Sequence, residues 1–313
     1  MQLHKIIMPT PYAVGDVNAF LLKGDALTLF DAGPKTQEAY EALQWGIRSA
    51  GYDMKDVEQV VLTHHHPDHA GWVDAFPDAA ILGHHYVDHW MRQEPDFLDY
   101  RNRFYIGELE KQGVPHDYIK RVVEVRGEME LFGTRPLTGF LAEGDEVPGH
   151  PGLMVYETPG HAQSHLIFVE DSTRECIGGD LLLERVSSNP LVEPPVTLDG
   201  ERPRSLLQYN ASLKKLRDLH VSKVYTGHGG EVLNASKLVE ERLAKQHTRA
   251  MKVREMIEEP KTVFEVTKQL FAKIYQLQLG LTLSETLGQL DYLVNEGLAA
   301  VMEENGVHVY RKA

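Results

Sequence analysis

The stretch of sequence that decides the fold reads Thr63-His64-His65-His66-Pro67-Asp68-His69. It directly follows residues 57–62, an apolar segment typical of a buried strand. Upstream, residues 27–30 form another apolar strand, and apolar side chains in residues 35–50 recur on one helical face. Strand, helix and strand in this order predict the βαβ unit of a layered α/β domain, with the histidine run at the end of its second strand.

The side chains of this run have the directions and the chemistry of metal ligands. Because side chains in an extended segment alternate, His64 and His66 are expected to project to one side and His65 to the other. Asp68 and His69, beyond the proline, can address a second metal beside the first. Catalytic zinc takes imidazole and carboxylate ligands and keeps one position open. The run therefore favours a metal-dependent hydrolase over a polar surface loop.

Composition and charge disfavour several other classes of protein, namely nucleic-acid-binding, disulfide-linked, membrane and secreted proteins. The chain of 313 residues has 42% hydrophobic and 25% charged residues, as expected for a globular protein with one large and one small domain. Its formal charge of −14 disfavours a general affinity for nucleic-acid phosphates. The single cysteine, Cys176, excludes an internal disulfide framework. No apolar stretch approaches the roughly 20 residues that span a bilayer, and no secretory signal is visible, so we expect a cytoplasmic protein without membrane contact.

The sequence pattern divides the chain into three parts. Residues 1–232 are expected to form the α/β domain, with a helical insertion at about 86–136 that is a candidate lid. Residues 233–260 are expected to form a linking helix, and residues 261–313 a small winged-helix-like domain. The last domain should contain helices over 263–274 and 283–295 and a hairpin over 301–309 that turns at Asn305-Gly306.

Three later segments complete a known pattern, namely Thr158-Pro159-Gly160-His161, Gly178-Gly179-Asp180 and Thr226-Gly227-His228-Gly229. Together with the histidine run, they resemble the metal-binding signature of the metallo-β-lactamase superfamily, which has these four pieces in the same order. Matching features extend from about residue 3 to residue 232. The resemblance implies an α/β fold, the family's αββα sandwich of two β-sheets between outer helices, here with a helical insertion and a small C-terminal winged-helix-like domain.

The resemblance also implies which residues bind metal. Two divalent ions are expected, zinc in the first place, although the same ligands suit iron or manganese. Asp180 would bridge the ions, and Asp68 would also orient the attacking hydroxide as a catalytic residue. Asp31 is expected to brace the histidine run, and His165 to support the ligands or face the substrate. The first ion would be held by His64, His66 and His161, and the second by Asp68, His69 and His228.

Details of the pattern narrow the activity. Flavodiiron relatives carry a glutamate at the position of His66, and antibiotic-hydrolysing relatives carry cysteine or histidine at the position of Asp180. The aspartate at that position resembles the hydroxyacylglutathione hydrolases, lactonases and nucleases. The leading hypothesis is therefore a binuclear metal-dependent hydrolase whose metal-bridging hydroxide cleaves a small-molecule ester, thioester or lactone.

The alternative is a phosphodiesterase or endoribonuclease that acts on single-stranded RNA. The C-terminal domain resembles the tail of a lactamase-like subgroup whose animal member is such an endoribonuclease. Yet residues 261–313 contain five basic side chains against six acidic ones, whereas a wing that binds nucleic acid is normally basic. A nucleic-acid partner is therefore the less favoured expectation, and packing or formation of a homodimer is the favoured role of this domain.

Substrate contacts are not assigned by any motif. Aromatic side chains of the insertion could line an apolar pocket for a small acyl group, or simply pack the insertion onto the domain. Arg101 and Arg103 could meet a substrate carboxylate or be solvated on a helix. The aromatic residues in question are Trp90, Phe97, Tyr100, Phe104 and Tyr105.

Overall fold

The computed structural model describes residues 1–123 and 129–313. The strands of its two large sheets span Leu3–Met8 (β1), Val17–Lys23 (β2), Leu27–Phe30 (β3), Gln59–Val61 (β4), Ala80–Gly83 (β5), Gly139–Phe140 (β6), Leu153–Glu157 (β7), Leu166–Glu170 (β8), Glu175–Gly179 (β9) and Lys223–Thr226 (β10). Within the described residues, the first sheet has the order β1-β2-β3-β4-β5-β6 and the second the order β10-β9-β8-β7. Strands β3 to β6 pair in parallel, as do β9 and β10.

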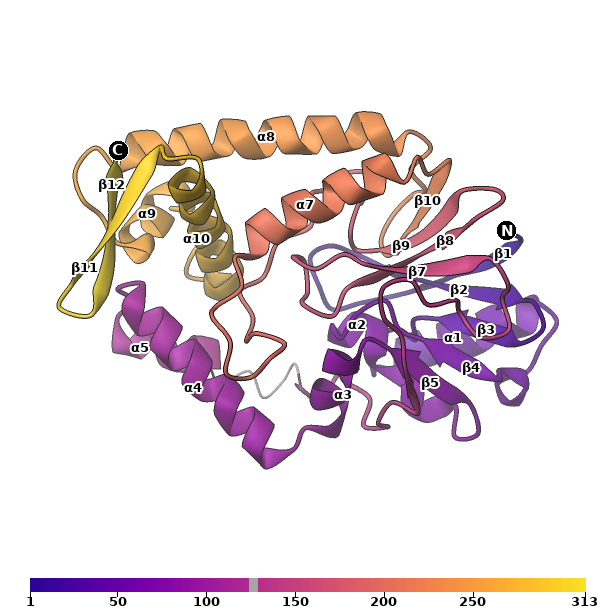
Figure 1. Cartoon of the computed structure of the whole chain (residues 1–313). Helices are drawn as coiled ribbons and strands as arrows, with labels where there is room; N and C mark the ends of the chain where they lie inside the picture. The colour runs from indigo at the N-terminus through magenta and orange to yellow at the C-terminus, as the bar shows by residue number, and fades with distance from the viewer. Residues whose placement is uncertain (124–128) are drawn as a thin grey trace.

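The two sheets pack face to face, and helices cover their outer faces (Figure 1). Because side chains alternate along a strand, Phe20 of β2 packs against the second sheet while Leu21 packs on the side of α1 (Gln37–Ser49). In β8, Phe168 meets the first sheet and Ile167 packs under α7 (Ser205–Asp218). The layers are therefore helix, sheet, sheet and helix, and the mixed α/β class that the sequence predicts is confirmed.

The insertion between β5 and β6 is helical in its described part, as α3 (His85–Arg92), α4 (Pro95–Lys111) and α5 (His116–Val123). Residues 124–128 of the predicted span lie outside the described residues. Trp90 and Phe97 are buried in the core of the α/β domain, whereas Leu109 packs against the C-terminal helices. These two aromatic residues therefore pack the insertion onto the domain, and α4 extends from there to the C-terminal part of the chain (Figure 1).

The C-terminal part consists of α8 (Ala235–Met256), α9 (Val263–Leu270), α10 (Leu279–Asn295), β11 (Ala299–Glu304) and β12 (Val307–Lys312). A long loop, residues 185–203, rests on α10. In this loop the Val192 N–H donates to Ser284 Oγ at 3.1 Å, and the Arg202 guanidinium pairs with both carboxylate oxygens of Asp291 at 2.8 Å. The C-terminal helices thus support a loop whose other side enters the functional site described below.

Element boundaries depart from the prediction in a few places. Helix α10 begins at Leu279 rather than at residue 283, and α9 ends at Leu270 rather than at residue 274. The hairpin turns at Asn305-Gly306 as predicted, with φ values of 53° and 81°. None of the described helices combines the length and the apolar composition that a membrane crossing needs.

Candidate metal centre

The histidine run lies between β4 and a single helical turn. Strand β4 ends at Val61, and α2 (Pro67–Ala70) begins at a proline, which suits this position because its missing N–H would have no partner there. The His69 N–H donates to the carbonyl of His66 at 2.9 Å and closes the turn. The turn places Asp68 and His69, both buried, beside the extended histidines, and the ring centroids of His64 and His69 are 4.2 Å apart.

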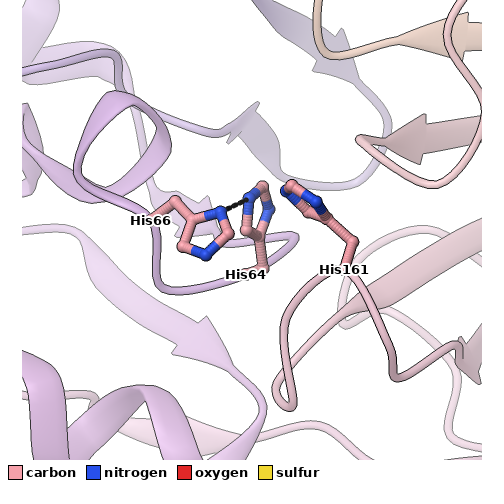
Figure 2. Close-up of side chains that lie close together, drawn as sticks. All are labelled: His64, His66 and His161. Atoms are coloured by element: carbon pink, nitrogen blue, oxygen red, sulfur yellow. Dashed lines mark hydrogen bonds between the residues drawn. The ribbon is translucent and has the colours of Figure 1, made fainter. Parts of the chain in front are cut away.

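Side chains in the extended part of the run alternate as the sequence predicts. His64 and His66 face each other, with 3.0 Å between His64 Nε2 and His66 Nδ1 (Figure 2). His65 points elsewhere, since its Nδ1 lies 2.7 Å from Ser164 Oγ and its ring stacks on Trp90 with centroids 4.4 Å apart. The donor atoms of His64 and His66 are therefore Nε2 and Nδ1, respectively, on one side of the chain.

Two glycines bring the remaining predicted ligands into position. Gly160, with φ of 132°, precedes His161, and a Cβ on this glycine would lie 2.3 Å from the Tyr209 amide nitrogen. Gly227 precedes His228, and a Cβ there would lie 2.1 Å from Asp180 Oδ1. Since real side chains do not tolerate such contacts, the turns after β7 and β10 require glycine to approach the site this closely.

Six of the predicted ligands form two groups, which we call donor groups because each residue offers one atom that could bind a metal ion. Within each group these atoms lie within 4.8 Å of one another. In the first group the three imidazoles point toward one another (Figure 2). Asp180 lies between the groups, because its Oδ2 is 3.5 Å from His161 Nε2 and 3.5 Å from His228 Nε2. The groups are His64 with His66 and His161, and Asp68 with His69 and His228.

Several of these buried donor atoms have no hydrogen-bond partner among the described residues. They are His69 Nε2, His161 Nε2, His228 Nε2 and Asp180 Oδ1. Leaving a buried polar atom unsatisfied costs about 1–3 kcal/mol, so four such atoms in one place call for a ligand that satisfies them together. Imidazole nitrogens and carboxylate oxygens are ligands that zinc and related divalent cations prefer. The residues present therefore fit divalent metal ions.

The other ring nitrogen of each histidine in the two groups has a partner. Such contacts fix the tautomer and the ring orientation, so that the remaining nitrogen is available to a metal. The contacts are His64 Nδ1 with Thr63 Oγ1 at 2.9 Å, His66 Nε2 with Glu193 Oε1 at 3.3 Å, His69 Nδ1 with Asp31 Oδ2 at 2.8 Å, His161 Nδ1 with Asn189 O at 2.9 Å and His228 Nδ1 with Asp16 O at 2.8 Å.

Asp31 and His165 lie behind the donor groups and belong to neither. Asp31, with φ of 61° at the end of β3, accepts from the N–H and the hydroxyl of Thr63 at 2.8 Å each and contacts His69. His165 Nε2 accepts from the Asp180 N–H at 3.1 Å, and its Nδ1 lies 2.8 Å from Thr158 Oγ1. The first residue thus braces the histidine run, and the second the backbone of Asp180.

Burial and charge act differently on the two groups. Burial and the neighbouring histidines hold the pKa of His64 well below its usual value, and burial with His66 lowers the pKa of His161 to about 4. Burial also opposes charge on His228, but Asp180 and Asp68 together outweigh it and raise that pKa to about 10. Burial opposes ionisation of Asp180 as well, yet His228 keeps its pKa well below the usual value. His64 and His161 are thus neutral imidazoles, and the ionised Asp180 places negative charge beside the second group.

One residue at the site, Glu193 in the long loop, is not predicted by any sequence motif. Its Oε1 lies 3.3 Å from His66 Nε2 and 3.2 Å from His65 Nε2, and its Oε2 accepts from the Gln163 N–H at 2.7 Å. Burial opposes ionisation, but His65 and His66 outweigh it and keep the pKa of Glu193 far below its usual value. A buried carboxylate therefore holds His66 from behind. The only signal in the sequence is an acidic residue between Val192 and Pro194.

Comparisons with known proteins identify the family of this chain. The family model described as the metallo-beta-lactamase superfamily matches residues 12–228. A probable metallo-hydrolase of Bacillus subtilis (strain 168), YqjP, is 42% identical over 306 residues, which are 97% of this chain and 96% of the relative. A beta-lactamase-like protein 2 homolog of Caenorhabditis elegans is 24% identical over 84% of this chain and 74% of the relative.

Solved structures are similar over nearly the whole chain. A metallo-beta-lactamase family protein from Thermus thermophilus superposes with a TM-score of 0.80 at 27% identity, covering 99% of this chain and 98% of that one. A beta-lactamase domain protein from Burkholderia ambifaria has a TM-score of 0.75 at 21% identity, over 99% and 92% of the two chains. The chain therefore belongs to the metallo-beta-lactamase superfamily, and it is a hydrolase of that superfamily.

Proposed function

We propose that this protein is a binuclear metal-dependent hydrolase that cleaves a small-molecule ester, thioester or lactone. The proposal rests on the two donor groups that flank Asp180 and on their buried donor atoms, several of which have no hydrogen-bond partner among the described residues. Asp180 would contact both ions, which we expect to be zinc. One ion would be held by His64, His66 and His161, and the other by Asp68, His69 and His228.

Each residue of the candidate site then has a defined role in the reaction. When bound, two divalent ions supply a hydroxide nucleophile at neutral pH and polarise the bond to be cleaved. Asp68, whose Oδ2 lies 3.3 Å from His228 Nε2, would orient the nucleophile through its other oxygen. Asp31 and His165 keep the histidine run and Asp180 in place through the contacts described above. The chain thus supplies charge and orientation rather than a nucleophile of its own.

A cleft beside the second donor group supports a small organic substrate. It has a volume of about 420 Å³ and reaches His228, which is within the usual size of small-molecule sites, roughly 300–1,000 Å³. Ile7, Val14 and Val186 line it and are 54%, 41% and 48% exposed. Apolar side chains next to the donor groups suit an acyl or alkyl part of a substrate better than a sugar–phosphate backbone.

The C-terminal part offers little to RNA. Lys312 pairs with Glu255 and Glu258 at 2.9 and 2.8 Å, and Lys261 Nζ donates to the carbonyl of Met256 at 2.6 Å. These contacts engage two of the five basic side chains of residues 261–313. We propose that residues 261–313 form a winged-helix-like module for packing or for a homodimer. We also propose a cytoplasmic location, which the single buried Cys176 supports.

The test is an assay of the zinc-loaded protein against a thioester, a lactone and single-stranded RNA. We expect turnover of the thioester or the lactone, and its loss together with bound zinc in His66→Ala and Asp180→Ala. His116→Ala is the matched control, since this histidine is exposed and lies outside the donor groups. Turnover of RNA alone would instead favour the endoribonuclease, and full activity in the two ligand variants would contradict a metal mechanism.

A further inference from the structure

Arg101 of α4 is a buried cation without a carboxylate partner in the described part of the chain. Only 9% of the surface of Arg101 is exposed. Among the described residues, no acceptor meets its Nε, and Nη1 donates to the side chain of the adjacent Asn102 at 3.0 Å. A guanidinium this deeply placed normally pairs with an anion, because desolvation of an unpaired charge is costly.

Aromatic rings hold the guanidinium in place but do not neutralise it. Its carbon atom Cζ lies 5.7 Å from the ring centroid of Trp90 and 4.9 Å from that of Tyr105. Cation–π contacts of this kind offset part of the cost of desolvation. They also fix the orientation of the planar group, whose N–H donors match the two oxygens of a carboxylate.

The buried carboxylates in this region are already engaged. Glu108 contacts Arg202 at 3.3 Å and Lys111 at 3.1 Å. Glu193 faces two imidazoles and accepts from a backbone N–H. Among the described residues, no carboxylate therefore neutralises Arg101, and its charge is available to a bound anion.

Arg101 is separated from the histidine run by one aromatic ring. Trp90, which the guanidinium contacts on one side, stacks on His65 with an interplanar angle of 12°. The neighbouring loop is fixed to α3, since the Tyr86 hydroxyl donates to the carbonyl of Pro194 at 2.9 Å. An anion at Arg101 would therefore lie on the His65 side of the histidine run, next to α3, α4 and this loop.

We infer that Arg101 binds a carboxylate of the substrate while the bond to be cleaved lies at the metal ligands. The substrate is then an anionic acyl ester or thioester with a carboxylate at its far end. This inference rests on the proposed hydrolase function, and it adds the charge of the substrate to it.

The test compares a neutral ester with charged esters of the same leaving group. 4-Nitrophenyl butyrate is the neutral probe, and the mono-4-nitrophenyl esters of succinate, glutarate and adipate carry a carboxylate at increasing distance. The readout is the ratio of kcat/KM for a charged ester to that for the neutral one. Wild type is expected to prefer one length of charged ester, and Arg101→Met to lower that ratio about 10- to 100-fold, as expected for a lost hydrogen bond to a charged group.

Arg103→Met is the matched control, because Arg103 is on the same helix and exposed. Its ratio is expected to equal that of wild type. Equal ratios in all three proteins, or a wild-type preference for the neutral ester, would overturn the inference. Arg101→Met should also melt at or above the wild-type temperature, since it removes a buried unpaired charge. A clear loss of stability with an unchanged ratio would make Arg101 a structural residue and reject its role in binding.

A binding measurement with glutarate tests Arg101 independently of ester hydrolysis. If wild type cleaves none of the esters, the ester hydrolase is contradicted, and glutarate alone then tests Arg101 in a thermal-shift assay. A rise in melting temperature for wild type and Arg103→Met, absent in Arg101→Met, would still support a carboxylate site. Equal shifts in all three proteins, or no shift in any, would reject it.

Discussion

Replacing Glu193 with glutamine is expected to weaken the metal centre while the fold remains intact. The glutamine side chain has the same size as glutamate. Its carbonyl oxygen can still accept from the Gln163 N–H, which lies 2.7 Å from Glu193 Oε2 in the wild type. Its amide group would then face His66 Nε2, which is 3.3 Å from Oε1 in the wild type. The His66 ring would lose its acceptor and with it the contact that aims Nδ1 toward His64.

The expected magnitude follows from the loss of one contact behind a ligand. Such losses weaken metal binding about 10- to 100-fold, which is about 1.4–2.8 kcal/mol. Competition with a chromophoric zinc chelator measures the two affinities separately. The ion at His64, His66 and His161 should be weakened more than the other. Glu240→Gln is the control, because Glu240 pairs with Arg217 in solvent. Affinities equal to wild type for both ions would refute this role of Glu193.

The remaining predictions concern the glycine turn, the long loop and the metals themselves. Gly227→Ala should lower zinc content in metal analysis, because its Cβ would lie 2.1 Å from Asp180 Oδ1, whereas Gly107→Ala in α4 meets no atom within 4 Å and should stabilise by about 0.5–1 kcal/mol. Arg202→Met should lower the free energy of unfolding in urea by about 3 kcal/mol, since it leaves Asp291 buried and unpaired. Removal of zinc by a chelator should lower the melting temperature, and zinc at about 1,000 times its Kd should restore about 4 kcal/mol. A chelated protein that melts at the same temperature would contradict this last prediction.

The parts of the fold that the sequence predicts are those with a local signal. Strands β2 and β3 alternate between two buried faces, and Asn305-Gly306 has the positive φ values that a tight hairpin needs. The sequence pattern predicts the start of α10 four residues too late, since Gly280 in its first turn has the signature of a helix breaker. The two residues of β6 carry no periodicity of their own and are held by pairing with β5.

In the candidate site, too, the sequence predicts the residues that lie in local motifs and misses those that depend on tertiary structure. The residues that the structure brings together lie in short motifs after strands, so their spacing is visible in the sequence. Their supports are not. Two histidines are fixed by the backbone carbonyls of Asp16 and Asn189, which any amino acid would supply. Glu193 meets His66 across 127 positions of sequence, through a loop whose path depends on α10. Such contacts arise from tertiary structure and leave no local pattern.

The proposed function requires two divalent ions between the seven side chains of the candidate metal centre. Diffraction from zinc-loaded crystals, with anomalous difference maps calculated on both sides of the zinc absorption edge, tests it most directly. We predict two peaks, one next to His64, His66 and His161 and one next to Asp68, His69 and His228, with Asp180 in contact with both. A single peak, or peaks away from these side chains, would show that the protein does not hold a binuclear metal centre at this site.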